Sequence, residues 1–131
     1  RLDWSIERRN EIAKRYDEAF GSGQYSVVSD QISIPYREEG IVHAFHLYVI
    51  EVQPEKRRAL YDYLRAHNIF AQVLYIPAHT MPYYKSLGHK EGKCPVAEDY
   101  YTRCLALPMY PSLTDEEQEY VIETIKEFFA Q

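Results

Sequence analysis

Residues 72–84 read Q-V-L-Y-I-P-A-H-T-M-P-Y-Y, and the rest of the chain is organised around this stretch. From Phe70 to Ile76 the side chains alternate in the two-residue period of a pleated ribbon, which predicts a β-strand. Pro77 cannot donate a hydrogen bond to a neighbouring strand, and Pro82 repeats the interruption. The chain is therefore expected to leave the sheet here and to enter a loop.

Two interpretations of this loop stay open on residue types alone. In one, His79 forms a polar-contact site with Tyr75, Tyr83 and Tyr84, because binding residues are often delivered on loops by a rigid strand. Imidazole and phenol groups supply hydrogen bonds and flat apolar faces without a large fixed charge, which suits a phosphorylated or hydroxylated ligand. In the other, an edge strand simply runs into a loop stabilised by its aromatic rings.

The composition indicates an ordinary globular domain. A length of 131 residues fits one domain, and apolar and charged fractions of 46% and 27% supply both a core and a solvated surface. The net charge is −5 with scattered basic residues, which argues against a nucleic-acid surface. No apolar run approaches the roughly 20 residues of a membrane span. Two cysteines, Cys94 and Cys104, are too few for a disulfide scaffold, so a cytoplasmic protein is expected.

The beginning of the chain and its tyrosine content are unusual. Arg1 leads directly into a predicted helix without an initiator methionine, which predicts a piece of a longer protein. The sequence has 13 tyrosines against 5 phenylalanines and 1 tryptophan. Because a buried phenol needs a partner for its hydroxyl, such a composition is typical of a surface that something else covers.

Hydrophobic periodicity and capping signals predict the other elements. A helix is expected over residues 3–20, with its charged face solvated. Residues 43–52 have the best strand pattern, and Asn68 stands where a helix end favours a left-handed residue. Thr114 and Glu117 have the spacing of a capping box at the start of the last helix. The remaining predictions are extended pieces at 27–28 and 32–34, helices at 54–67 and 95–102, and a strand at 103–107.

These elements predict an α+β fold, arranged as a two-layer sandwich. A strand–helix–strand passage of this length sets the strands at 43–52 and 70–76 parallel to each other. The short strand at 103–107 is expected between them and antiparallel to both, with the helices on one face. We therefore expect a three-to-four-stranded mixed sheet.

The sequence has no common catalytic or metal-binding motif. A glycine-rich phosphate loop, H-E-x-x-H and G-x-S-x-G are all missing from it. His79, His89, Cys94 and Cys104 are residue types that bind zinc, but their spacings are long and lack a C-x-x-C pair. No metal site is expected, and no nucleophile with its base can be assigned.

Several segments, taken in order, resemble one family. The opening R-R-N-E-I-A-K-R-Y resembles the helix that leads into the C-terminal domain of the DegT/DnrJ-type sugar aminotransferases. The domain itself is matched by H-A-F-H-L-Y-V-I, R-x-x-L-x-x-x-L, N-I-x-x-Q-V-L-Y-I-P-A-H-T-M-P-Y-Y, P-V-A-E-D-Y-Y and L-A-L-P-M-Y-P-S-L-T-D-E-E. Within the family, the motifs are most similar to transaminases that make UDP-4-amino-4,6-dideoxy-N-acetyl-β-L-altrosamine for pseudaminic acid, and to spore-coat polysaccharide relatives.

The resemblance implies an enzyme of the aspartate-aminotransferase fold that uses pyridoxal 5'-phosphate (PLP). It would move an amino group from glutamate to C4 of a keto-sugar nucleotide. Residues 1–21 would be a lead-in helix and residues 22–131 the small C-terminal domain. The Schiff-base lysine and the cofactor cradle belong to the large N-terminal domain, which this sequence lacks, so no catalytic residue is expected here. The chain alone would be inactive, and would supply substrate-side and dimer contacts in a homodimer.

The family's Y-x-P-x-H motif maps onto Tyr75, Pro77 and His79. With Tyr84, the tyrosine and histidine of this motif are the expected substrate-binding residues. Many members have a histidine immediately before that tyrosine, whereas this chain has Leu74. A leucine cannot hydrogen-bond a phosphate or a hydroxyl, so the identity of the sugar is left open.

Two other classes of function fit the same sequence. The chain could be a stand-alone module that binds a sugar nucleotide without catalysis. It could also be a structural dimerisation domain that uses its tyrosines as an interface. Titration with a UDP-sugar separates these two, because only the binding module responds.

Overall fold

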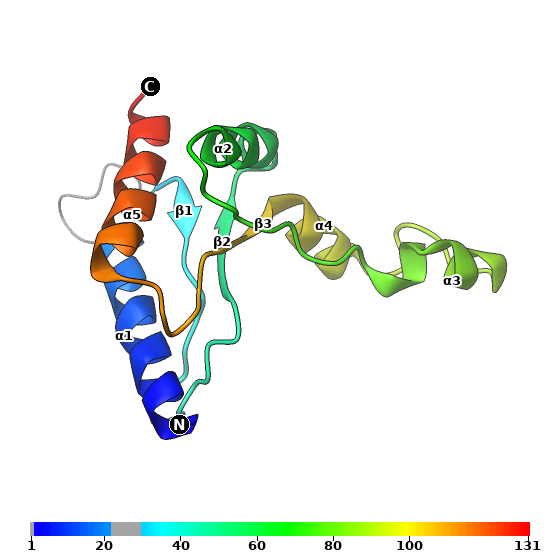
Figure 1. The fold of residues 1–131 in the computed structure, drawn as a ribbon. Coiled ribbons are helices and arrows are strands. Elements are labelled where there is room, and N and C mark those ends of the chain that lie inside the picture. Colours follow the sequence, from blue (N-terminus) through cyan, green and yellow to red (C-terminus); the bar gives the residue numbers. More distant parts are fainter. Residues whose placement is uncertain (1, 22–29) are drawn as a thin grey trace.

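Three short strands and five α-helices form the part of the chain that the computed structural model describes, residues 2–21 and 30–131 (Figure 1). The strands are β1 (Ile32–Ser33), β2 (Tyr48–Val52) and β3 (Cys104–Leu107). The helices, with one 3-10 turn η1, are α1 (Leu2–Phe20), α2 (Pro54–Ala66), η1 (Ala78–Thr80), α3 (Pro82–Ser86), α4 (Pro95–Arg103) and α5 (Asp115–Ala130). The predicted α+β class is confirmed, and the piece expected at 27–28 lies outside the described residues.

The sheet is antiparallel and has the order β1-β2-β3. β3 pairs with β2 from Tyr48 opposite Leu107 to Glu51 opposite Cys104. On its other side, Ala106 of β3 pairs with Gln72 through two backbone hydrogen bonds of 2.8 and 2.9 Å. β3 therefore lies between β2 and the segment around Gln72, antiparallel to both, as predicted. The expectation of a mixed sheet was wrong, because every pairing in the described sheet is antiparallel.

Two predicted strands are much shorter in the structure. The strand expected at 43–52 begins only at Tyr48, because Phe45 has a positive φ of 42° that breaks the extended run. The strand expected at 70–76 is reduced to the single bridge at Gln72. β3 has only four residues and ends before Pro108, so it offers few partners to a longer neighbour.

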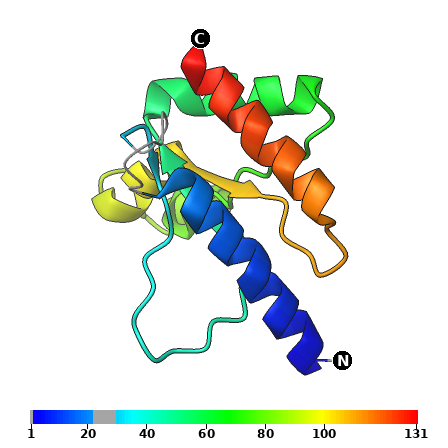
Figure 2. The ribbon, with the colours of Figure 1, turned by 90° about the vertical axis from the view of Figure 1, so that its left-hand side faces the viewer.

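The core lies between the sheet and a layer of helices. Figures 1 and 2 show α1 and α5 side by side on one face of the sheet, with α2 crossing one end of it. Tyr48, Ile50 and Val52 of β2 are buried, while the residues between them are only partly covered. The two largest fully buried side chains are phenols whose hydroxyls have partners: Tyr16 donates to the Pro108 carbonyl at 3.0 Å and Tyr48 to Asp17 at 2.7 Å. Burial raises the pKa of both phenols.

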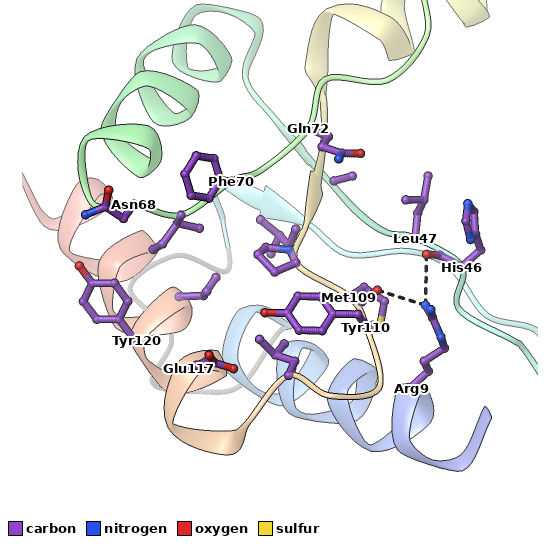
Figure 3. A pocket seen from close by; sticks show the side chains of 16 residues that line it. Arg9, His46, Leu47, Asn68, Phe70, Gln72, Met109, Tyr110, Glu117 and Tyr120 are labelled. Carbon is purple, nitrogen blue, oxygen red and sulfur yellow. Dashed lines mark hydrogen bonds between the residues drawn. The ribbon is translucent and has the colours of Figure 1, made fainter. Parts of the chain in front are cut away.

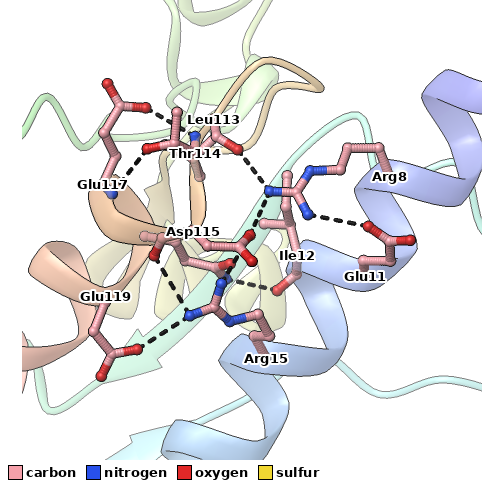
Figure 4. Close-up of polar contacts among 10 residues, drawn as sticks. Arg8, Glu11, Ile12, Arg15, Leu113, Thr114, Asp115, Glu117 and Glu119 are labelled. Atoms are coloured by element: carbon pink, nitrogen blue, oxygen red, sulfur yellow. Dashed lines mark hydrogen bonds and ion pairs between the residues drawn. The ribbon is translucent and has the colours of Figure 1, made fainter.

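The charged face of α1 is not simply solvated, contrary to expectation (Figure 4). The Arg8 guanidinium donates at 2.7 Å to both the Leu113 carbonyl and the Asp115 carboxylate at the start of α5. Arg15 adds contacts to Asp115 at 2.8 Å and to Glu119 at 3.2 Å. These bonds therefore join α1 to α5, two helices that are far apart in the sequence.

The local signals at helix ends are confirmed. Asn68 follows α2 with a φ of 60°, the left-handed conformation that asparagine tolerates. At the start of α5, the Thr114 hydroxyl accepts from the Glu117 amide at 3.1 Å, and the Glu117 carboxylate accepts from the Thr114 amide at 2.9 Å. This is the predicted capping box.

Residues 77–94, here called the arm, project away from the sheet and carry η1 and α3 (Figure 1). None of the residues from 72 to 103 is buried. The arm is thus shaped by contacts within itself and with α4 rather than by the core.

Candidate functional site

The arm is tied to α4 by a hydrogen-bonded pair, His79 and Glu98. The ring Nε2 of His79, in η1, lies 2.7 Å from Oε1 of Glu98, in the first turn of α4. The Gly92 amide donates to both carboxylate oxygens at 2.9 Å, and the Cys94 amide donates to Oε1 at 3.2 Å. Gly92 has a φ of 84°, which a side chain rarely tolerates. Glu98 therefore connects η1, the Gly92 turn and the start of α4.

This environment favours the ionised carboxylate. The Gly92 amide, followed by the His79 side chain, lowers the pKa of Glu98 below its ordinary value. An ionised carboxylate accepts hydrogen bonds only, so the donors around it are matched to its charge.

The structure does not bring all the predicted site residues into contact. The Tyr75 side chain is 94% exposed at the base of the arm. The Tyr84 ring makes edge contacts with Tyr83 and with His89 on the outer part of the arm. Within residues 2–21 and 30–131, no hydrogen bond or ring contact joins either tyrosine to His79. The three predicted residues thus share one segment but not one contact cluster.

Sequence reasoning missed Glu98 as the partner of His79. The two residues are 19 apart, with α3 and the Gly92 turn between them. The only local signal was the carboxylate of P-V-A-E near a helix start, which by itself indicates a favourable interaction with the helix dipole. Their contact depends on the path of the whole arm.

A cavity of about 500 Å³ lies away from this pair, between the Asn68–Gln72 side of the sheet and α5 (Figure 3). Three of its charged or polar side chains, Arg9, Glu117 and Tyr120, are already engaged. Arg9 donates to the carbonyls of Phe45 at 2.7 Å, Met109 at 3.1 Å and His46 at 3.3 Å. Glu117 belongs to the capping box and Tyr120 donates to the His67 carbonyl at 3.2 Å.

None of Tyr75, His79 and Tyr84 lines that cavity. Tyr75 instead lines a more open hollow of about 670 Å³, which shares Phe70 and Gln72 with it. We keep the candidate site at His79 and Tyr75, which the Y-x-P-x-H motif indicates, rather than in the cavity of about 500 Å³, which neither of them lines.

Clusters of possible metal ligands and long apolar helices were both sought among the described residues. No group of three His, Cys, Asp or Glu side chains that could hold a metal ion is present in residues 2–21 and 30–131. Cys104 is a buried residue of β3, Cys94 is exposed, and His89 contacts Lys93. No helix in this part of the chain is long and apolar enough to cross a membrane.

The lysines do not fit the role of a Schiff-base residue. A lysine that forms a Schiff base is activated by desolvation or by a second cation. Five of the six are exposed, and Lys126 is partly buried but lies 2.8 Å from Glu123. Lys14 faces Glu18 at 3.8 Å and Lys85 faces Glu91 at 3.1 Å. The residues of this chain therefore do not fit a covalently held PLP.

Comparison with solved structures gives the class of protein. Spr1654 from Streptococcus pneumoniae, solved in its PLP form, has a TM-score of 0.83 against this chain, with 28% identity over 96% of this chain and 31% of its own. The fold is that of the small domain of a PLP-dependent aminotransferase, as the sequence predicted.

The chain belongs to the DegT/DnrJ/EryC1/StrS aminotransferase family, whose model matches residues 1–126. It is 38% identical over 133 residues to the spore coat polysaccharide biosynthesis protein SpsC of Bacillus subtilis, covering 97% of this chain and 33% of SpsC. It is 31% identical over 128 residues to dTDP-3-amino-3,4,6-trideoxy-α-D-glucose transaminase of Micromonospora megalomicea, covering 97% of this chain and 33% of that enzyme. The chain thus spans about a third of the length of these relatives.

Proposed function

We propose that this chain is the small C-terminal domain, with its lead-in helix over residues 1–21, of a cytoplasmic homodimeric PLP-dependent sugar aminotransferase. The enzyme would transfer an amino group from glutamate to the C4 keto group of a nucleotide sugar, in surface-polysaccharide or glycan biosynthesis. The observation that carries this proposal is the family match over residues 1–126 in a chain that spans about a third of its relatives.

The chain's own share would be on the sugar-nucleotide side of the site. Tyr75 is exposed on a segment paired with β3, and His79 is fixed by Glu98 in the arm that follows. Tyr84 lies further out and would contact the ligand only at the edge of the site. PLP supplies an electron sink for amino transfer when it is bound. The lysine that holds it would come from the large domain.

An assay of the purified chain with PLP, glutamate and a keto-sugar nucleotide tests this division of labour. No 2-oxoglutarate should form beyond the rate that PLP gives without protein. Formation of 2-oxoglutarate that requires the chain and is lost when one of its six lysines is changed to alanine would refute the assignment.

Titration with UDP-N-acetylglucosamine separates the remaining possibilities. Chemical-shift changes that include His79 and Tyr75 support a substrate-side role. A chain that self-associates but shows no change with the sugar nucleotide would instead be a dimerisation module.

A further inference from the structure

We propose that Glu98 is the positioning residue for His79, and that it leaves Nδ1 of the imidazole facing outward as the hydrogen-bond acceptor for a hydroxyl of the ligand's sugar. The inference rests on the proposed function, because it takes His79 as a substrate-side residue. Beyond that function, it assigns the orientation of the His79 ring to Glu98 and the group that the ring recognises to a sugar hydroxyl.

The identity of the ring's donor nitrogen follows from the charge of its partner. Glu98 accepts from Gly92, Cys94 and His79, and each of these contacts favours the ionised form. An ionised carboxylate has no proton to donate, so Nε2 of His79 must carry the hydrogen in the 2.7 Å contact. A neutral imidazole has one N–H group, so its Nδ1 is then a lone-pair acceptor.

The second nitrogen is free and can be reached from solvent. The His79 side chain is 11% exposed, and only its Nε2 has a hydrogen-bond partner in the described structure. Nδ1 has no hydrogen-bond partner among the described residues and is not fully buried. It is the unused polar atom of a ring that is otherwise fixed in place.

The acceptor character of Nδ1 selects the group it can bind. Phosphate oxygens of a nucleotide are acceptors at neutral pH and cannot donate to a lone pair. A sugar hydroxyl can donate. For a neutral ring, the geometry therefore points to the sugar ring, and not to the diphosphate, as the partner of His79.

Glu98 is itself held firmly enough to act in this way. The Gly92 amide bonds both of its oxygens at 2.9 Å, and the left-handed φ of Gly92 aims that amide at the carboxylate. A carboxylate fixed by backbone donors fixes the ring in turn, as outer partners do for other histidine ligands.

Nitrogen-15 NMR of the histidine rings in the 131-residue chain tests the positioning role without any ligand. At a pH where the His79 ring is neutral, we expect the Nε2–H tautomer in the wild type. Glu98→Gln should mix the two tautomers, because an amide can donate as well as accept. Glu91→Gln is the matched control, since Glu91 contacts Lys85 in the same arm, and it should leave His79 unchanged. A wild-type ring protonated on Nδ1 would overturn the proposal.

Binding of UDP-N-acetylglucosamine and of UDP by the same variants tests the ligand assignment. Glu98→Gln should weaken binding of the sugar nucleotide by roughly fivefold to tenfold, the effect of one hydrogen bond, and should leave UDP binding unchanged. Equal weakening for both ligands would overturn the assignment to the sugar hydroxyl. If the wild type binds neither ligand, the proposed substrate-side function fails, while the tautomer measurement still decides the role of Glu98.

Discussion

Replacing Gln118 of α5 with methionine is expected to stabilise the folded chain. Its side chain is fully buried between α5 and α1. Its Nε2 donates to the Ile12 carbonyl at 2.8 Å, but its Oε1 is buried without a partner. Ile12 lies inside α1, where its carbonyl also accepts the bond that continues the helix.

The magnitude follows from comparing the two polar atoms. The bond from Nε2 contributes about 1 kcal/mol, whereas an unsatisfied buried acceptor costs about 1–3 kcal/mol. Methionine has a similar length and flexibility and removes both. We therefore expect Gln118→Met to raise the free energy of unfolding by about 1 kcal/mol. Gln118→Ala, which also leaves a cavity, should lower it by about 2 kcal/mol.

Urea unfolding followed by circular dichroism measures both values, provided that the slope m stays constant. Gln53→Met is the matched control, because Gln53 is an exposed residue whose side chain makes no cap bond, and it should change stability by less than about 0.5 kcal/mol. If Gln118→Met destabilises the chain as much as Gln118→Ala does, then Oε1 has a partner in solution and the reasoning fails.

Three further predictions concern two helix ends and the loss of stability at low pH. Thr114→Ala should lower the free energy of unfolding in urea by about 1 kcal/mol, because it removes the cap bond to Glu117. Thr114→Ser keeps the hydroxyl and should retain most of this stability. Equal losses in the two variants would show that the hydroxyl is not the cause. Asn68→Ala should lower the free energy of unfolding by about 1 kcal/mol, because the left-handed φ of 60° is unfavourable for alanine. Asn68→Gly should leave the free energy of unfolding unchanged or raise it. Urea unfolding measures both variants. Arg8, followed by Arg15, lowers the pKa of Asp115. The carboxylate therefore stabilises the native chain above the unfolded-state pKa of about 4. This stabilisation is lost as the pH falls through the lower pKa of the native state. The difference in melting temperature between wild type and Asp115→Asn should therefore be present at pH 7 and should close on acidification; a difference independent of pH would contradict the ionic origin.

The helices were predictable because their signals are local. Pro54 marked the start of α2 and Asn68 the second residue after its end, while Thr114 and Glu117 located the start of α5. Each signal acts within one turn of the chain, so no tertiary knowledge is needed to interpret it.

The strands and the site were less predictable because they depend on distant partners. Residues 70–76 alternate like a strand, yet the length of a strand is set by its neighbour, and β3 offers a single pairing at Ala106. The strand start at 43 failed because Phe45 turns its carbonyl toward Arg9 of α1, a contact across 36 residues. The motif located His79, but the carboxylate that holds its ring could not be inferred from spacing.

The contacts between α1 and α5 also determine when the chain can complete its fold during synthesis. Arg8 and Asp115 are 107 residues apart, and Gln118 reaches back 106 residues to Ile12. At translation rates of about 5–20 residues per second, roughly 5–20 s pass before α5 can meet α1. During that interval the part of α1 that faces α5 has no final partner on the nascent chain, although Tyr16 and Asp17 can already meet Tyr48 of β2. Molecular chaperones that recognise exposed apolar helices are therefore expected to act on α1 before its last contacts form.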